Sequence, residues 1–211
     1  MKDAIVNHIS DCINVKQLLA QDVYINIIEK IARAIITAYE NNKKVILCGN
    51  GGSASDALHI EGELVGRFKM ERRALPAIAI VSGSSTMTAI GNDYGYDSVF
   101  SRQVEAHGME GDVLLGFSTS GNSPNVIDAV LQAKSSGMIT IGMLGKTGGI
   151  LKNLSDISLI VPSDDTPRIQ ECHILVGHVI CDIVEKALFI DNSPVYKGYE
   201  KSSISGSRWH N

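Results

Sequence analysis

Short apolar runs that alternate with helical segments constrain the fold of this chain most strongly. The runs are apolar toward both faces of a strand, which is typical of parallel strands buried in the middle of a protein. Alternation of such strands with helices predicts a parallel, doubly wound α/β sheet. The five predicted strands are Val45–Leu47, Ala77–Val81, Asp112–Phe117, Ile139–Leu144 and Ile157–Val161.

Helices are expected before, between and after these strands. Residues 3–42 have apolar side chains at three- and four-residue steps, which predicts an N-terminal helical segment. A break near Gln21 divides it into two helices. Because no linker or repeat follows, residues 1–190 are predicted to form a single domain, and the polar residues 191–211 a lightly docked tail. Further helices are expected from Ser53, through Met87–Ile90, over 125–136 and over about 168–188.

Composition narrows the class of protein. A length of 211 residues, 44% hydrophobic and 20% charged, fits a globular protein with a real core. The net charge of −4 argues against a nucleic-acid partner. No apolar run reaches about 18 residues, so no membrane partner is expected. Four cysteines without a CxxC pair fit reduced thiols and a cytoplasmic location: Cys12, Cys48, Cys172 and Cys181.

A glycine-rich turn links the first strand to its helix. Backbone N–H groups of Asn50, Gly51, Gly52 and Ser53 would approach an anion closely, and the helix N-terminus favours negative charge. The alternative is a tight turn in which Ser53 caps the helix. The stretch also matches the dinucleotide pattern GxGxxA, which is weak evidence alone. Ser82–Ser85 stand where a dinucleotide fold would want an acid after the second strand.

A hydroxyl-rich loop follows the third strand. Ser118, Thr119, Ser120 and Ser123 lie just before a helix that starts at Pro124 or Asn125. Hydroxyl and backbone donors can hold a phosphate without a lysine. The alternative is a capped turn.

Two further glycine-containing segments are less specific. Gly91–Tyr96 is a turn by composition, in which Asn92 and Asp93 either hydrogen-bond sugar hydroxyls or serve only the turn. Gly145-Lys146-Thr147 invites a nucleoside-triphosphate interpretation, but the position five residues before Gly145 is Thr140, so the phosphate-loop pattern fails.

Histidines on two predicted helices suggest a metal site. His59 and Glu63 share one helix face, although such a pair alone is more often an ordinary contact. With Gln170 and His178 they offer a tetrahedral N/O set for Zn²⁺. Eight residues of straight helix span about 12 Å. Gln170 and His178 therefore reach one ion only if the helix is irregular or if two chains contribute, which points to a subunit interface. His173, between them, is expected to be structural.

Taken together, these segments resemble the sugar isomerase (SIS) fold, and specifically the bacterial phosphoheptose isomerases. The motifs STSGNSPNV, GNDYG and RIQExH identify the resemblance, which covers roughly residues 1 to 190. It implies a cytoplasmic homotetramer with active sites between subunits. The implied reaction interconverts sedoheptulose 7-phosphate and D-glycero-D-manno-heptose 7-phosphate, the first step towards ADP- or GDP-heptose for lipopolysaccharide core or capsule.

The resemblance also implies roles for individual residues. The first loop and the hydroxyl-rich loop would hold the phosphate, and one Zn²⁺ per subunit is expected. Glu63 and His178 would transfer the proton through a cis-enediol, although a carboxylate bound tightly to zinc is a poorer base. Substrate contacts are expected from Asn50, Gly51, Gly52, Ser53, Glu63, Asn92, Asp93, Ser118, Thr119, Ser120, Ser123 and Gln170, and metal ligands from His59, Glu63, Gln170 and His178.

Two alternatives come from other functional classes. One is a non-catalytic SIS tetramer, similar to the factor that assembles replication initiator at the bacterial origin. The complete His59, Glu63, Gln170 and His178 set with both loops distinguishes an enzyme from such a scaffold. The other is a sugar-phosphate-sensing regulatory domain, but no helix-turn-helix accompanies the chain.

Overall fold

The computed structural model describes residues 1–190, so the predicted tail at 191–211 lies outside the described residues. Residues 1–190 contain one five-stranded sheet in the order β2-β1-β3-β4-β5, with every neighbouring pair parallel. The predicted doubly wound α/β fold is therefore confirmed. Each strand lies within two residues of its predicted bounds: β1 is Val45–Gly49, β2 Ala77–Ala79, β3 Val113–Ser118, β4 Ile139–Leu144 and β5 Ile157–Ile160.

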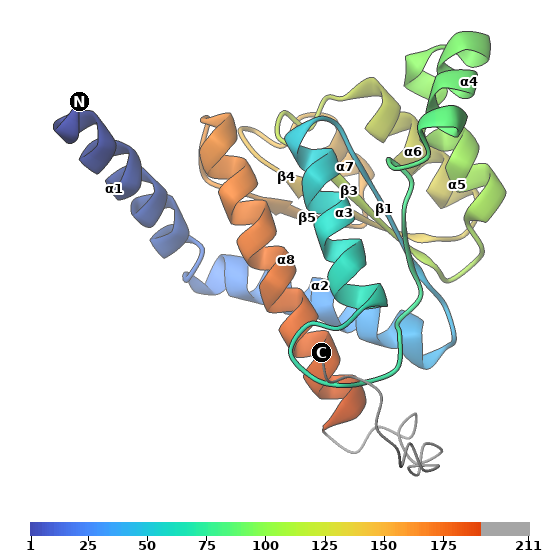
Figure 1. Ribbon diagram of the computed structural model, residues 1–211, viewed down its shortest axis with the longest axis horizontal. Helices are drawn as coiled ribbons and strands as arrows, with labels where there is room; N and C mark the ends of the chain where they lie inside the picture. The colour runs from blue at the N-terminus through green and yellow to red at the C-terminus, as the bar shows by residue number, and fades with distance from the viewer. Residues whose placement is uncertain (191–211) are drawn as a thin grey trace, which may run out of the picture.

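Helices cover both faces of the sheet (Figure 1). The N-terminal segment divides at Gln21, as predicted. One face is covered by α2 (Asp22–Glu40), α3 (Gly52–Val65) and α8 (Thr166–Phe189), with α1 (Lys2–Leu18) beside α8. The other is covered by α4 (Ser84–Tyr94), η1 (Tyr96–Ser98), α5 (Ser101–His107), α6 (Pro124–Ser135) and α7 (Leu151–Leu154).

The predicted turn at Gly91–Tyr96 is wrong for most of its length. Helix α4 continues through Asn92 and Asp93 to Tyr94, and Gly95 ends it with a φ of 87°. The turn-forming residues therefore occupy the last turn of a helix, and only Gly95 has the backbone conformation that glycine favours. The separate helices η1, α5 and α7 were not among the predicted elements.

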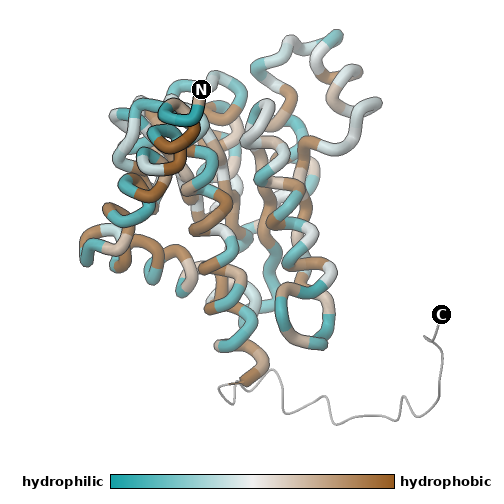
Figure 2. Tube along the Cα trace, turned by 60° about the vertical axis from the view of Figure 1, so that its left-hand side comes forward, coloured by the Kyte–Doolittle hydropathy of each residue, from teal (hydrophilic) through white to brown (hydrophobic). Residues whose placement is uncertain are grey.

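Alternation along the strands produces two apolar cores. Val45 and Leu47 of β1 pack with α2, α3 and α8, whereas Ile46 and Cys48 pack with α5 and α6. Along the helices in Figure 2, apolar and polar residues alternate, as expected of helices with one buried side. Burial on both faces explains why the strands appear in the sequence as continuous apolar runs.

The strand order brings two loops together at one edge of the sheet. β1 and β3 are neighbours, yet β1 leads into α3 on one face and β3 into α6 on the other. Such a reversal at the carboxyl ends of parallel strands opens the crevice in which ligands of doubly wound folds bind. The glycine-rich and hydroxyl-rich loops both lie at this point.

Helix α1 projects from the body of the molecule (Figure 1). It has no buried residue, and four of its apolar side chains are about half exposed: Ile5, Val6, Ile9 and Ile13. Over residues 1–190, no helix has the length and apolar character needed to cross a membrane.

His173 of α8 is fully buried, in agreement with the structural role predicted for it. Its Nε2 lies 3.0 Å from the carbonyl oxygen of Leu144, and its Nδ1 has no hydrogen-bond partner among the described residues. Burial lowers the pKa of His173 to about 4, although the hydrogen bond to Leu144 opposes the shift. The ring is therefore neutral in the folded chain at neutral pH.

Acid should destabilise the fold partly through His173. The unfolded chain binds a proton at this residue below a pKa of about 6.5, whereas the folded chain does so only near 4. Stability is therefore lost as pH falls from 6.5 towards 4, by roughly 2 kcal/mol at pH 5. We expect His173→Gln, which can still donate to Leu144, to reduce the loss between pH 7 and pH 5 by this amount in urea titrations. Equal losses in both proteins would contradict the assignment.

Candidate active site

The first loop presents the N-terminus of α3 without a side-chain cap. Gly51 is the N-cap residue, with a φ of 57° that favours glycine, and no described side chain caps the helix. The alternative in which Ser53 caps α3 is wrong, because Ser53 lies inside the first turn and its N–H bonds to the carbonyl of Asn50 at 3.0 Å. Uncapped N–H groups at a helix N-terminus are suited to an anion.

The second loop arranges hydroxyl groups in front of α6. The Ser118 and Ser123 Oγ atoms lie 2.9 Å apart, and the Ser118 Oγ accepts the Gly121 N–H at 3.1 Å. Ser123 is the N-cap residue, but among the described residues no side chain caps this helix either. Both helices that begin at the switch point therefore leave N-terminal donors for a ligand.

The Gly145–Gly149 segment, which failed the nucleotide pattern, supports the second loop. A Cβ at Gly121 would lie 1.9 Å from the carbonyl oxygen of Gly148, so the two backbones are in direct contact. The Asn122 Oδ1 also accepts the Ile150 N–H at 2.9 Å. Only glycine at 121 allows this approach.

A reciprocal pair of amides ties the two loops together. The side chains of Asn50 and Asn125 exchange two hydrogen bonds, both 2.8 Å long, and the Tyr96 hydroxyl donates to the Asn50 Oδ1 at 3.2 Å. The Asn50 side chain is thus engaged with protein, and it joins the first loop to the start of α6. Sequence analysis missed Asn125 and Tyr96, because nothing in the local pattern links them to Asn50.

Asn92 and Asp93 lie at the end of α4, where both are exposed. The Asn92 Nδ2 donates to the Asp93 Oδ1 at 2.8 Å. Tyr96, three residues after Asp93, reaches the first loop through Asn50.

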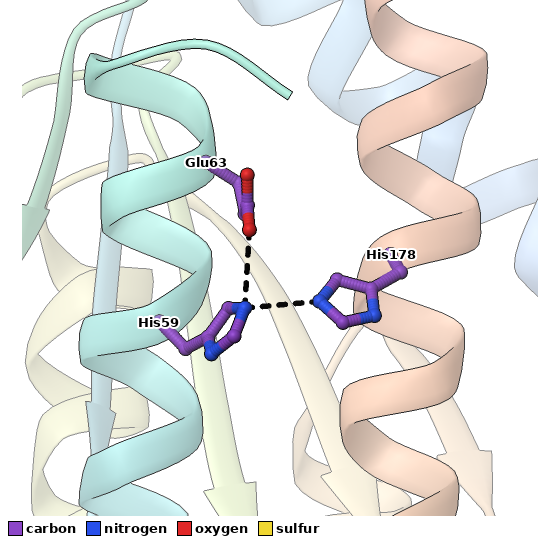
Figure 3. A group of neighbouring side chains, drawn as sticks. All are labelled: His59, Glu63 and His178. Carbon is purple, nitrogen blue, oxygen red and sulfur yellow. Dashed lines mark hydrogen bonds and ion pairs between the residues drawn. The ribbon is translucent and has the colours of Figure 1, made fainter. Parts of the chain in front are cut away.

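Three of the four predicted metal ligands converge. His59 and Glu63 extend from α3 towards His178 on α8 (Figure 3). The His59 Nε2 lies 3.1 Å from the Glu63 Oε1 and 3.0 Å from the His178 Nε2. One atom from each residue lies within 4.8 Å of the others. We refer to these three residues as the His–Glu–His cluster.

The donor chemistry of the cluster fits a divalent cation. A neutral imidazole has one N–H, so the His59 Nε2 cannot satisfy both the Glu63 carboxylate and a second imidazole with a full hydrogen bond. A cation among the three atoms would accept a lone pair from each. Two imidazoles and a carboxylate are ligands that Zn²⁺ prefers, with a position left open.

The fourth predicted ligand lies elsewhere in this chain. Helix α8 is continuous from Thr166 to Phe189, so Gln170 and His178 are separated by about 12 Å along its axis. The Gln170 amide instead lies over Gly52, where an added Cβ would be 2.6 Å from its Nε2. Gln170 therefore lies beside the glycine-rich loop and not with the His–Glu–His cluster of its own chain.

Two contacts that position the cluster were missed from the sequence. A Cβ at Gly177 would lie 2.5 Å from the Ile60 Cδ1, so α8 and α3 approach closely beside His178 and His59. The Phe68 ring stacks on His178, with centroids 5.6 Å apart and planes inclined by 23°. A glycine within an apolar helix was the available signal for the first contact.

Asp56 lies on α3 one turn before His59. Its carboxyl is half-buried, and its Oδ2 has no hydrogen-bond partner among the described residues. Burial raises the pKa of Asp56 to about 6, and the nearby His59 opposes the shift.

Comparison with known proteins identifies the family of this chain. The SIS domain family matches residues 14–145. The chain is 55% identical over 190 residues to a phosphoheptose isomerase of Clostridium acetobutylicum, covering 90% of this chain and 97% of the relative. It is 51% identical to one of Aneurinibacillus thermoaerophilus, covering 90% and 96%.

A solved structure shows the same relationship. A phosphoheptose isomerase from Francisella tularensis superposes with a TM-score of 0.84 at 41% identity, covering 87% of this chain and 97% of that one. The chain therefore belongs to the SIS domain family and, within it, to the phosphoheptose isomerases.

Proposed function

We propose that this isomerase interconverts D-sedoheptulose 7-phosphate and D-glycero-D-manno-heptose 7-phosphate, and so supplies heptose for a surface glycan. One observation supports this most strongly. Helix α3 has an uncapped N-terminus, which suits an anion, and the same helix presents His59 and Glu63 to His178. The phosphoheptose isomerases related to it provide the substrate class.

The two loops hold the phosphate in this proposal. Backbone donors at Gly51 and Gly52 face it from α3, and hydroxyls of Ser118 and Ser123 face it from α6. His59 lies seven residues after Gly52, about 10 Å along the helix axis. Binding energy from the phosphate end thereby orients the reacting carbons at the other end.

Glu63 removes the proton from the carbon beside the carbonyl, and the resulting cis-enediol accepts a proton at the neighbouring carbon. His178 is the partner acid/base that serves the substrate oxygen. Both side chains lie in one cluster, as a proton transfer between adjacent carbons requires. Zn²⁺ held by His59, Glu63 and His178 would supply a Lewis acid for the carbonyl oxygen.

We further propose a homotetramer with active sites between subunits, in the cytoplasm. Support for the assembly comes from the apolar side chains that α1 and α8 leave exposed, among them Ile9 and Val179. Gln170 supports it as well, because it would complete the ligand set only from a second chain. The four cysteines, all within the described residues and all free thiols, agree with a reducing compartment.

Incubation with sedoheptulose 7-phosphate tests the proposal directly. We expect NMR to show conversion to the aldose phosphate, loss of turnover after dialysis against a chelator, and recovery on addition of Zn²⁺. A correctly folded protein that is inactive in every state would favour the non-catalytic scaffold.

Replacing the proposed base should abolish turnover without unfolding the chain. Glu63→Gln keeps the shape of the side chain but cannot accept the proton, so we expect kcat to fall at least roughly 100-fold. Glu61→Gln is the matched control, because Glu61 is a partly buried carboxylate two residues away on the same helix. Normal turnover by the Glu63 variant, with unchanged circular dichroism, would refute the role.

Removing a hydroxyl from the second loop should weaken substrate binding. A hydrogen bond to a charged group is worth about 1.5–3 kcal/mol, so Ser123→Ala should raise KM roughly 10- to 100-fold and change kcat less. Ser135→Ala, at the other end of α6, should leave both constants unchanged because, within residues 1–190, the Ser135 hydroxyl donates only to the nearby Gln132 carbonyl. An unchanged KM in the Ser123 variant would argue against phosphate binding at this position.

A further inference from the structure

A buried ion pair joins the loop between α3 and β2 to helix α8. It thereby links the two helices that carry the His–Glu–His cluster. The Arg72 Nε donates to the Glu185 Oε1 at 2.9 Å, and their side chains are only 1% and 2% exposed. Arg72 belongs to the loop that follows α3. Glu185 belongs to α8, seven residues beyond His178 and therefore on the same helix face.

Arg72 holds the C-terminus of α3. Its Nη2 donates to the carbonyl oxygen of Glu63 at 2.7 Å, and its Nη1 donates to that of Leu64 at 2.9 Å. Carbonyls in the last turn of a helix lack partners within the helix, and a cation there also interacts favourably with the helix dipole. The guanidinium thus fixes the backbone of the residue proposed as base.

Glu185 holds the loop against α8. Its carboxylate accepts the N–H groups of Phe68, Lys69 and Met70 at 3.2, 2.9 and 3.0 Å. These bonds place the Phe68 ring on His178. Burial alone would raise the pKa of Glu185, but these backbone donors and Arg72 outweigh it and lower the pKa, so the carboxylate is charged.

We propose that Arg72 and Glu185 are positioning residues for the His–Glu–His cluster: the pair fixes Glu63 through its carbonyl and His178 through Phe68. This inference rests on the proposed function and adds residues that touch neither substrate nor metal. A buried ion pair contributes little net stability when compared with apolar replacements. The pair instead holds the loop and the two helices in position, because a planar guanidinium can bond to Glu185 and to the end of α3 at the same time.

The test compares two ion pairs whose carboxylates are buried, although Lys44 of the second pair is itself only partly buried. Arg72→Met leaves Glu185 without its cation. Lys44→Met is the matched control, because it leaves the buried Asp112 carboxylate without its cation while Asp112 keeps its backbone donors. That pair lies at the N-terminal ends of β1 and β3, whereas the two loops follow the C-terminal ends of these strands.

Cobalt(II) affinity, read from its ligand-field absorption, is measured on each folded protein together with kcat, KM and the melting temperature. We expect both variants to melt at lower temperature. Only Arg72→Met should bind Co²⁺ roughly 10- to 100-fold more weakly, as loss of groups that orient metal ligands usually does. It should also lower kcat more than it raises KM, because the phosphate loops are at the other end of α3.

The inference would be overturned if folded Arg72→Met bound Co²⁺ as tightly as the wild type does. It would also be overturned if Lys44→Met lost as much Co²⁺ affinity as Arg72→Met. If Arg72→Met does not fold, the Co²⁺ affinity of Arg72→Lys replaces it in the test, and the same loss is expected. A lysine retains the charge but cannot reach Glu185 and both carbonyls together. A wild-type chain that binds Co²⁺ without turnover refutes only the proposed function, and the Co²⁺ series still decides the inference. A wild-type chain that binds no Co²⁺ overturns the inference itself.

Discussion

The close contact between α3 and α8 is the constraint on which the candidate site depends. At Gly177 the backbone of α8 lies against the Ile60 side chain, at a distance that leaves no space for a Cβ. The next residue on α8 is His178, and the residue before Ile60 is His59. Because a glycine lets the helices approach, the Nε2 atoms of His59 and His178 can lie 3.0 Å apart. A larger residue at 177 would separate the groups that the proposed chemistry needs together.

Helix α3 also relates the two ends of the substrate site. Its N-terminus follows the glycine-rich loop, its middle presents His59 and Glu63, and its last carbonyls are held by Arg72. In the proposed site, the spacing between the phosphate and the reacting carbons would be set by helix rise rather than by flexible side chains. Under the proposed function, such rigidity would favour one length of sugar phosphate, because a shorter chain bound at the same loop would not bring its carbonyl to Glu63.

Features of the fold and of the site that depend on a local pattern of residues could be predicted from the sequence. Apolar runs and helical periodicity predicted the strands and the sheet class, because burial on two faces leaves a continuous signature. The four-residue spacing of His59 and Glu63 predicted their shared face for the same reason. Contacts between distant segments have no such signature: the Asn50–Asn125 pair and the stacking of Phe68 on His178 arise only once the chain has folded. The turn predicted at Gly91 failed because turn-forming residues are also tolerated in the last turn of a helix, where Gly95 marks the end.

Gln170 gives the strongest reason to regard the site as shared between chains. Since α8 is one continuous helix, Gln170 and His178 of the same chain are too far apart along its axis to hold one ion, and the Gln170 amide lies over Gly52. The apolar side chains Leu175, Val179 and Ile183 recur every four residues along α8 and are each more than a third exposed. His178 lies beside this stripe, one residue before Val179, and faces α3. A second chain that covers the stripe would bring its own polar groups to the open side of the His–Glu–His cluster, and it would exclude water from the place where the proton transfer is proposed.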